Sequence, residues 1–219
     1  MATPNTPRES SLLYDTKLDY VIAALLVVQG LIIALIGLLL VNLDRSAFAT
    51  ELAAELTADP EFTFSISQPA LAAAIETLLT WTAIGFLVAG VGTVLIAASF
   101  FRYRGRVRDL IAVGDSPPRW HAPLLGGLVA TAISFIPFSQ LVGGAVAGTA
   151  STRSPTLDGA LAGAVFGAPS YVIWAAIAAG TFAAGTPFLI IVVLISLLLT
   201  VAINVVLSAV GGFAARLLS

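Results

Sequence analysis

Long apolar runs without an ionisable side chain constrain this chain more than any other feature. A helix needs about 20 mostly apolar residues to cross a hydrocarbon core of roughly 30 Å, and a charge inside that core is costly. Five runs reach this length: 20–43, 78–101, 122–150, 159–182 and 187–215. Only 10% of all residues are charged, against about 25% in a soluble domain. We therefore predict an all-α integral membrane protein built as a helical bundle.

The segments between the runs are polar, and one of them is strongly acidic. Residues 44–77 carry six acidic side chains against Arg45 alone. Apolar and acidic residues each recur every four positions between Phe48 and Asp59, which predicts an amphipathic helix in a small extracellular cap. The predicted order is a cytoplasmic tail at 1–19, span 20–43, the acidic cap at 44–77, span 78–101, a basic cytoplasmic loop at 102–121, a glycine-rich segment at 122–150, span 159–182 and span 187–215.

Basic residues cluster at one place in the chain and so indicate its orientation. Lys and Arg in short flanking loops mark the cytoplasmic side of a membrane. The cluster consists of Arg102, Arg104, Arg106 and Arg108. It predicts a cytoplasmic N-terminus and an extracellular loop 44–77, in a multi-pass protein of the cell membrane. The arginines alternate with Tyr, Gly and Val, and the net charge is only -2. No nucleic-acid partner is therefore expected.

The run 122–150 has two interpretations, because it is longer than a single span requires. One continuous helix of 29 residues would extend about 43 Å. A break at Pro137 would instead give two short helices that turn back as a hairpin. The hairpin keeps Arg153 and Arg216 on the side of the arginine cluster, so we favour four full spans plus this Pro-broken hairpin. Five straight spans are the alternative.

Small residues are dense between positions 124 and 180, and they predict close helix contacts. Membrane helices associate largely through such Gly and Ala faces, where backbones approach closely. The candidate helix-packing residues are Gly143, Gly144, Gly148, Gly159, Gly163 and Gly167. The last three fall at i, i+4 and i+8, which is one face of a helix. Pro169 predicts a kink in the same span.

The chain offers few side chains for chemistry. Gln29 and Asn204 are polar residues inside spans, and we interpret them as interhelical hydrogen-bonding groups. There is one histidine, His121, and no cysteine, and the apolar runs contain no acid or base that could activate a nucleophile or bind a metal. We expect no catalytic residue, no metal, no cofactor and no enzymatic activity.

Five short segments in the second half of the chain have a distinctive sequence: Leu125–Gly127, Phe135–Pro137, Leu141–Gly148, Asp158–Gly163 and Gly211–Phe213. Through these segments the chain resembles a family of small Gly- and Ala-rich integral membrane proteins of unknown function from haloarchaea. The similarity covers about Pro123 to Ser219. The resemblance implies an archaeal cytoplasmic membrane protein from a halophile, and it brings no activity, cofactor or catalytic residue.

Two functions remain open. We favour a structural, assembly or binding subunit that packs through its Gly and Ala helix faces, a glycine zipper. Its partners would be the lipid bilayer and either further copies of the chain or another membrane protein. The alternative is a channel or transporter for a neutral solute. A weak 32-residue repeat places Gly127–Gly148 over Gly159–Gly180 with Pro137 over Pro169, and internal repeats are a feature of transporters.

Overall fold

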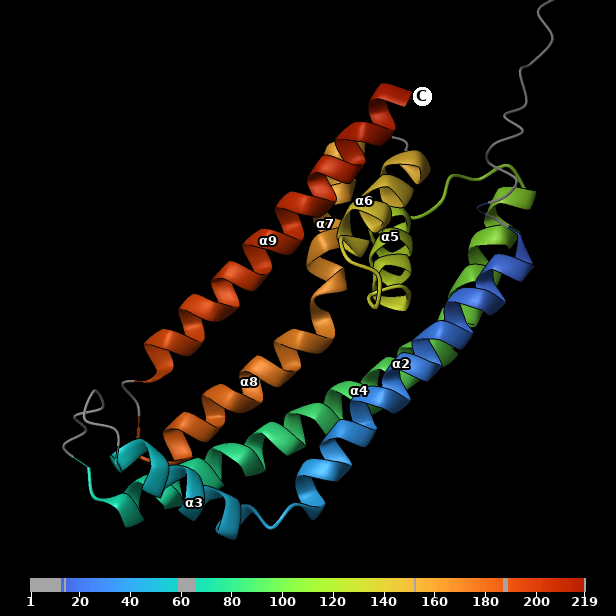
Figure 1. The fold of residues 1–219 in the computed structure, drawn as a ribbon. Helices are drawn as coiled ribbons and strands as arrows, with labels where there is room; N and C mark the ends of the chain where they lie inside the picture. The colour runs from blue at the N-terminus through green and yellow to red at the C-terminus, as the bar shows by residue number, and fades with distance from the viewer. Residues whose placement is uncertain (1–12, 14, 59–65, 152, 187–188, 219) are drawn as a thin grey trace, which may run out of the picture. The chain divides into compact units, whose positions relative to one another are not determined.

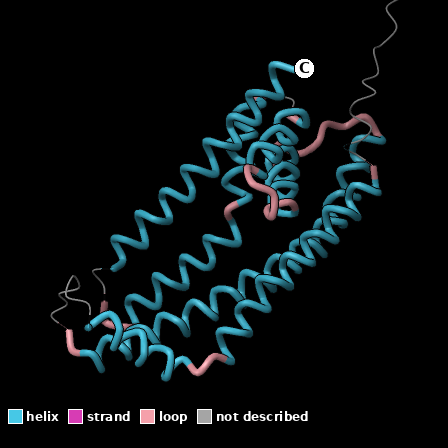
Figure 2. Tube along the Cα trace, in the orientation of Figure 1, coloured by secondary structure: helices cyan, strands magenta, loops and turns pink. Residues whose placement is uncertain are grey.

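All described secondary structure in this protein is α-helical. The computed structural model describes Leu13 and residues 15–58, 66–151, 153–186 and 189–218, and within them Figure 2 shows helices and loops but no strand. The eight helices there are α2 (Thr16–Asn42), α3 (Arg45–Ala58), α4 (Gln68–Ala112), α5 (His121–Ala132), α6 (Ser139–Ala150), α7 (Pro155–Phe166), α8 (Ala168–Ala183) and α9 (Leu189–Leu218). The predicted all-α class is thereby confirmed.

Three helices are long and apolar enough to cross a membrane. These are α2, α4 and α9, and a fourth candidate is the pair α7 and α8, which is bent by 47°. Two short helices, α5 and α6, take up the run 122–150, and the turn between them contains Pro137. The structure thus holds three or four candidate spans, while the number that crosses the membrane stays a prediction.

Helix α4 is longer than the sequence analysis expected, because it continues through the basic segment. The basic loop 102–121 was predicted to contain a short separate helix from Val107 to Val113, whereas in the structure residues 102–112 are all helical and continue α4. The segment contains no proline, and its single glycine does not interrupt a helix with good formers on both sides. The helix ends at Gly114, which has a φ of 86°. Its N–H donates to Ile111 O and that of Asp115 to Leu110 O, a Schellman motif that needs a left-handed residue.

The predicted kink at Pro169 lies two residues earlier, at Gly167. Helix α7 ends at Phe166 and α8 begins at Ala168, so Pro169 is the second residue of a new helix. Proline lacks an N–H, and the first turn of a helix is where that donor is not needed. Gly167, the last member of the predicted stripe, therefore lies at the break and not on the helix face that carries Gly159 and Gly163.

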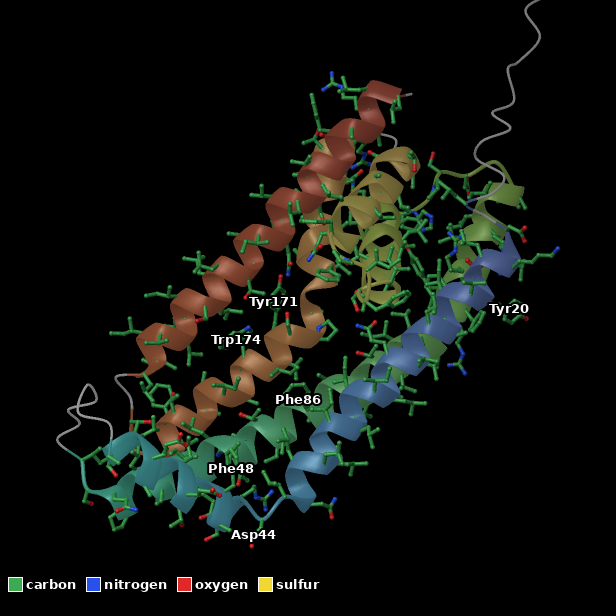
Figure 3. The ribbon with its side chains drawn as sticks, viewed as in Figure 1. Tyr20, Asp44, Phe48, Phe86, Tyr171 and Trp174 are labelled. Atoms are coloured by element: carbon green, nitrogen blue, oxygen red, sulfur yellow. The ribbon has the colours of Figure 1, made fainter. Side chains whose placement is uncertain are left out.

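The chain forms two compact units, and α2, α4 and α9 contribute segments to both. Unit 1 consists of Met1–Gln29, Thr93–Ala168 and Val201–Ser219, and unit 2 consists of Gly30–Gly92 and Pro169–Thr200. In unit 1, α5, α6 and α7 lie side by side (Figure 1). Tyr20 on α2 (Figure 3) contacts Phe101 on α4 with ring centroids 5.1 Å apart.

Unit 2 is also held by small residues. A Cβ atom on Gly90 would lie 2.6 Å from the Gly30 carbonyl oxygen, and one on Gly85 would lie 3.2 Å from the Ile173 Cα atom. Helix α4 therefore packs closely on both α2 and α8 within this unit.

Helix α3 occupies the segment predicted as the cap, and its buried face overlaps the predicted one, because Leu52 and Leu56 are partly buried. Asp44 Oδ1 (Figure 3) caps its first turn by accepting the Ala47 N–H at 3.0 Å, a strongly preferred arrangement. Ala49 and Ala53 are buried, whereas Phe48 of the predicted apolar face is exposed. Residues 59–65 of the cap lie outside the described residues.

Candidate functional site

Six glycines of unit 1 bring three helices into backbone contact, and we call them the glycine seam. They are Gly144 and Gly148 on α6, Gly159 and Gly163 on α7, and Gly211 and Gly212 on α9. A Cβ atom on Gly159 would lie 2.6 Å from the Ser208 carbonyl oxygen, and one on Gly163 would lie 2.7 Å from the Asn204 carbonyl carbon. Real Cβ atoms essentially never approach other atoms within 3.0 Å. The seam therefore excludes larger side chains unless the helices separate.

The α5–α6 hairpin is closed in the same way. A Cβ atom on Gly143 would lie 2.5 Å from both the Ala130 Cβ atom and the Gly126 carbonyl oxygen. Gly127 on the other side of α5 faces Val165 on α7, where the corresponding distance is 2.5 Å. Helix α5 thus packs on α6 and on α7 through adjacent glycines.

These contacts show where the predicted packing residues lie. Five of the six, Gly143, Gly144, Gly148, Gly159 and Gly163, face other helices of the same chain within unit 1. Gly167 is buried at the break between α7 and α8. The glycine faces are therefore already filled by this chain's own helices, and the sequence alone does not indicate which partner fills them.

The two polar residues singled out from the spans both bond other segments of unit 1: Gln29 bonds the turn between α5 and α6, and Asn204 bonds α6. The Gln29 amide donates to Ser134 Oγ at 2.7 Å. The Gln140 amide donates to Asn204 Oδ1 at 3.3 Å, and Ser208 Oγ donates to the Gln140 carbonyl at 3.0 Å. Asn204 and Ser208 are buried, so α6 and α9 share a polar contact inside the glycine seam.

A buried charge cluster joins the start of α2 to the end of α4. Asp19 and Arg104 are both 0% exposed, and Arg104 Nε donates to Asp19 Oδ1 at 2.7 Å. Arg108 pairs with the other oxygen of Asp19, and Arg104 also donates to the Leu13 carbonyl. The Asp19 carboxylate and the Leu13 carbonyl accept hydrogen bonds from the two arginines. These bonds pair several N–H donors that would otherwise lack an acceptor when buried.

His121, the first residue of α5, completes this cluster. Arg104 Nη1 lies 3.3 Å from His121 Nε2, and Arg has donors only, so Nε2 is the acceptor of a neutral ring. His121 precedes the apolar run 122–150. Burial, and next the neighbouring Arg104 charge, lower its pKa to about 4 against an opposing effect of Asp19. The imidazole is therefore neutral at physiological pH.

The structure divides the arginine cluster into two pairs. Arg104 and Arg108 point toward Asp19, while Arg102 and Arg106 are exposed. Residues four apart share a helix face, and those two apart lie on opposite faces. Residues 102–106 were predicted as part of a loop, and residues in a loop cannot be assigned to the same or to opposite faces of a helix. The ion pair with Asp19 was missed for that reason, although the i, i+4 spacing of Arg104 and Arg108 was its signal.

No group of three or more His, Asp or Glu side chains able to hold a metal occurs within the described residues. Among those residues the clustered polar groups are instead the interhelical bonds and the ion pairs given above. These hydrogen bonds and ion pairs hold segments of unit 1 together.

By class, the chain is an all-helical protein with three or four helices able to cross a membrane. Residues 120–218, a little under half of its 219 residues, match a family described as Family of unknown function (DUF5518). The match covers nearly the same residues as the expected resemblance over Pro123 to Ser219, and it confirms that this region belongs with sequences of unknown function. The haloarchaeal source stays a prediction. A search of curated proteins found no match. A search of solved structures found none either.

Proposed function

We propose that this protein is a multi-spanning membrane protein that serves as a structural or binding subunit. The single observation that carries the proposal is the glycine seam, which holds α6, α7 and the C-terminal part of α9 in backbone contact. Close packing through Gly and Ala replaces the hydrophobic driving force that is absent between helices in lipid. The seam makes unit 1 a rigid body that can present its outer surfaces to lipid or to a partner. We propose no enzymatic activity.

The helix directions in unit 1 support a cytoplasmic side for its polar end. Gly144 and Gly148 face Ser208 and Gly212, so α6 runs parallel to α9. Gly163 and Gly159 face Asn204 and Gly212, so α7 runs the opposite way. The starts of α5 and α7 and the ends of α6 and α9 thus share one end of unit 1, and His121 ties that end to Arg104. We propose that Arg153, Arg216 and the C-terminus are cytoplasmic, with the loop 44–77 outside.

The partner surface lies away from the glycine seam. Large apolar side chains project from the unit 1 part of α9, where Ile203, Val206 and Val210 are each more than half exposed. Lipid tails would cover such a face in a membrane. Self-association, or binding of another membrane protein, would use outer faces of this kind and not the seam.

Light scattering of the purified chain in detergent tests whether the glycine seam holds the structure together. Gly163→Leu is expected to abolish a monodisperse species, because the new side chain would meet the backbone of Asn204 and Val205. Gly105→Leu is the matched control, since nothing lies within 4 Å of a Cβ atom there, and it should leave the particle unchanged. If Gly163→Leu gives the same stable particle as the control, the seam does not carry the structure.

Single-cysteine labelling tests the membrane topology. The chain has no native cysteine, so Ser46→Cys, Ser151→Cys and Ser219→Cys each introduce one thiol. An impermeant reagent added to intact cells should label only the first. Labelling of all three would overturn the hairpin topology in favour of five straight spans.

Solute transport is the competing function, and one observation favours it. Helices are interrupted twice in comparable places, between α5 and α6 and between α7 and α8, and broken helices form the binding sites of many transporters. The polar groups beside the first break, Gln140 and Asn204, bond each other. Vesicles containing the protein should therefore show no flux of glycerol or urea above protein-free vesicles, and a flux that Gly144→Ala abolishes would establish the transporter instead.

A further inference from the structure

A polar cavity of about 290 Å³ lies at the shared end of α5, α6 and α7 within unit 1. Its wall includes Arg119 and His121 before and at the start of α5, Ala150 at the end of α6, and Arg153 and Asp158 around the start of α7. A water molecule occupies about 30 Å³ in the liquid. The cavity thus has room for about ten non-hydrogen atoms, which is the size of a phosphoglycerol group.

The two arginines of this cavity differ from those of the buried cluster, because within the described part of the chain neither pairs with a carboxylate. The ion pairs among the described residues join Asp19 to Arg104 and Arg108. Neither Arg119 nor Arg153 makes one there. Guanidinium groups bind phosphate through two parallel N–H donors, and basic pockets at the cytoplasmic ends of membrane helices suit anionic headgroups.

Two helix starts add to the positive potential of the cavity. Neither Trp120, the N-cap of α5, nor Ser154, the N-cap of α7, makes a side-chain capping bond. The His121 N–H already donates to the Pro118 carbonyl at 2.9 Å, and Pro123 has no N–H, so the first turn of α5 offers only the Ala122 N–H. A free N–H and the helix dipole favour an anion at such a position. Pro155 begins α7 without an N–H of its own, so the donors on offer there are the next two amides of that helix.

The charge of the lining selects among phosphate ligands. Arg119 and Arg153 contribute two positive charges, Asp158 contributes one negative charge, and His121 is neutral, so the lining carries a net charge of +1. A phosphodiester carries one negative charge and matches this value. A phosphate monoester or inorganic phosphate carries nearly two at neutral pH.

We propose that this cavity binds the phosphodiester headgroup of an anionic phospholipid through Arg119 and Arg153. Asp158 accepts a hydrogen bond from a headgroup hydroxyl and reduces the affinity for doubly charged phosphates. The lipid source rests on the proposed membrane location, whereas binding of a soluble phosphate ester would not.

Native mass spectrometry of the full chain in a nonionic detergent measures the binding directly. The probes are short-chain phosphatidylglycerol, phosphatidylcholine of the same chain length, and glycerol phosphate. Phosphatidylglycerol should bind at least about tenfold more tightly than either other probe, because the choline cation cancels the charge of phosphatidylcholine and glycerol phosphate carries a second negative charge that the lining does not match. Tighter binding of glycerol phosphate would overturn the lipid assignment while leaving the membrane topology, tested by cysteine labelling, untouched.

Charge-matched variants identify the site. Arg119→Gln with Arg153→Gln should weaken phosphatidylglycerol binding at least about tenfold. Arg102→Gln with Arg106→Gln removes the same charge from an exposed face of α4 and should change it less than threefold, at about the level of screened surface charges. Equal losses in both double variants would overturn the site.

A third variant keeps the proposal testable if the arginine variant does not fold. Asp158→Asn raises the net charge of the lining and should shift the preference toward glycerol phosphate by at least about threefold relative to phosphatidylglycerol. An unchanged preference in a folded Asp158→Asn protein would overturn the charge-matching argument and with it the proposal.

Discussion

Replacing Gly163 by alanine is the most direct test of the glycine seam, because the three nearest neighbours of the new methyl group are all backbone atoms. The nearest is the Asn204 carbonyl oxygen, and the Cβ atom would lie 2.7 Å from the Asn204 carbonyl carbon and 2.9 Å from the Val205 Cα atom. No side-chain rotation can relieve these contacts. Helix α7 must instead move away from α9 by at least about 0.7 Å to bring the carbonyl carbon to an ordinary separation of about 3.4 Å, and further to clear the carbonyl oxygen.

Two opposing effects set the size of the change in stability. A radial gap of 0.5–1 Å forfeits about a quarter to a half of the dispersion energy of each contact along the interface, and overpacking a close-packed site costs about 1–3 kcal/mol. Alanine in place of glycine in a helix recovers about 1 kcal/mol. The separation also loosens Gly159, one turn away on the same face, so the upper end of the cost applies. We expect Gly163→Ala to lower the free energy of unfolding by about 2 kcal/mol.

The matched control is Gly105→Ala on α4, where a Cβ atom has no neighbour within 4 Å. Helix propensity alone acts there, so this variant should be more stable than the parent by about 0.5–1 kcal/mol. Reversible unfolding of the purified protein in mixed detergent micelles, followed by the fluorescence of its three tryptophans, measures both values. If Gly163→Ala is as stable as Gly105→Ala, the close approach of α7 to α9 is not part of the native structure.

Three further changes test the polar contacts of unit 1. Asp19→Asn removes the carboxylate shared by Arg104 and Arg108 and should lower the free energy of unfolding by about 3 kcal/mol, since it leaves buried charge unpaired; Asp109→Asn on the exposed face of α4 should stay within about 0.5 kcal/mol. His121 has a pKa of about 4 in the folded protein, below the ordinary histidine value of 6.5, so the unfolded chain binds more protons between these pH values. The free energy of unfolding should have its highest value above pH 6.5 and should fall by up to about 3 kcal/mol toward pH 4. His121→Asn should remove this pH dependence when unfolding is measured across the same range. A double-mutant cycle of Gln140→Leu and Asn204→Leu should give a coupling of about 0.6 kcal/mol, the average for such bonds in membranes, and a coupling of zero would show that the two side chains do not interact.

Run length and charge alone were enough to predict the helical class. Helices and closed barrels both satisfy the backbone in a membrane, but an uncharged run of about 20 or more apolar residues has the length of a spanning helix and not of a barrel strand. The interruption of the run 122–150 was also predictable, because Pro137 falls in the middle of a segment too long for one span. The structure places Pro137 between α5 and α6. The continuation of α4 through residues 102–106 was not predicted, because this basic segment was interpreted from its charge, and charge does not stop a helix.

The partner of each glycine face could not be obtained from the sequence. The spacing of Gly159 and Gly163 defines a face but carries no information on what covers it. The backbone atoms of residues 204–212, more than 40 positions away, cover it in the structure. Asp19 and Arg104 are likewise 85 positions apart. Each lies near the end of an apolar run, where a charge exposed to solvent is as usual as a buried ion pair, so their pairing could not be predicted.

The glycines and the arginines of unit 1 therefore have different roles. Glycines whose faces are filled by their own chain contribute to folding, and a partner cannot reach them without opening α6 and α7 from α9. Arg104 and Arg108 are also occupied, because both neutralise Asp19. Arg119 and Arg153 have no such carboxylate partner among the described residues, and they lie at the end where α5 and α7 begin. A buried contact contributes to the free energy of folding. Charged donors that line an accessible cavity contribute instead to the free energy of binding a ligand. The arginine-lined cavity is accordingly the part of unit 1 whose residues are better explained by binding than by folding.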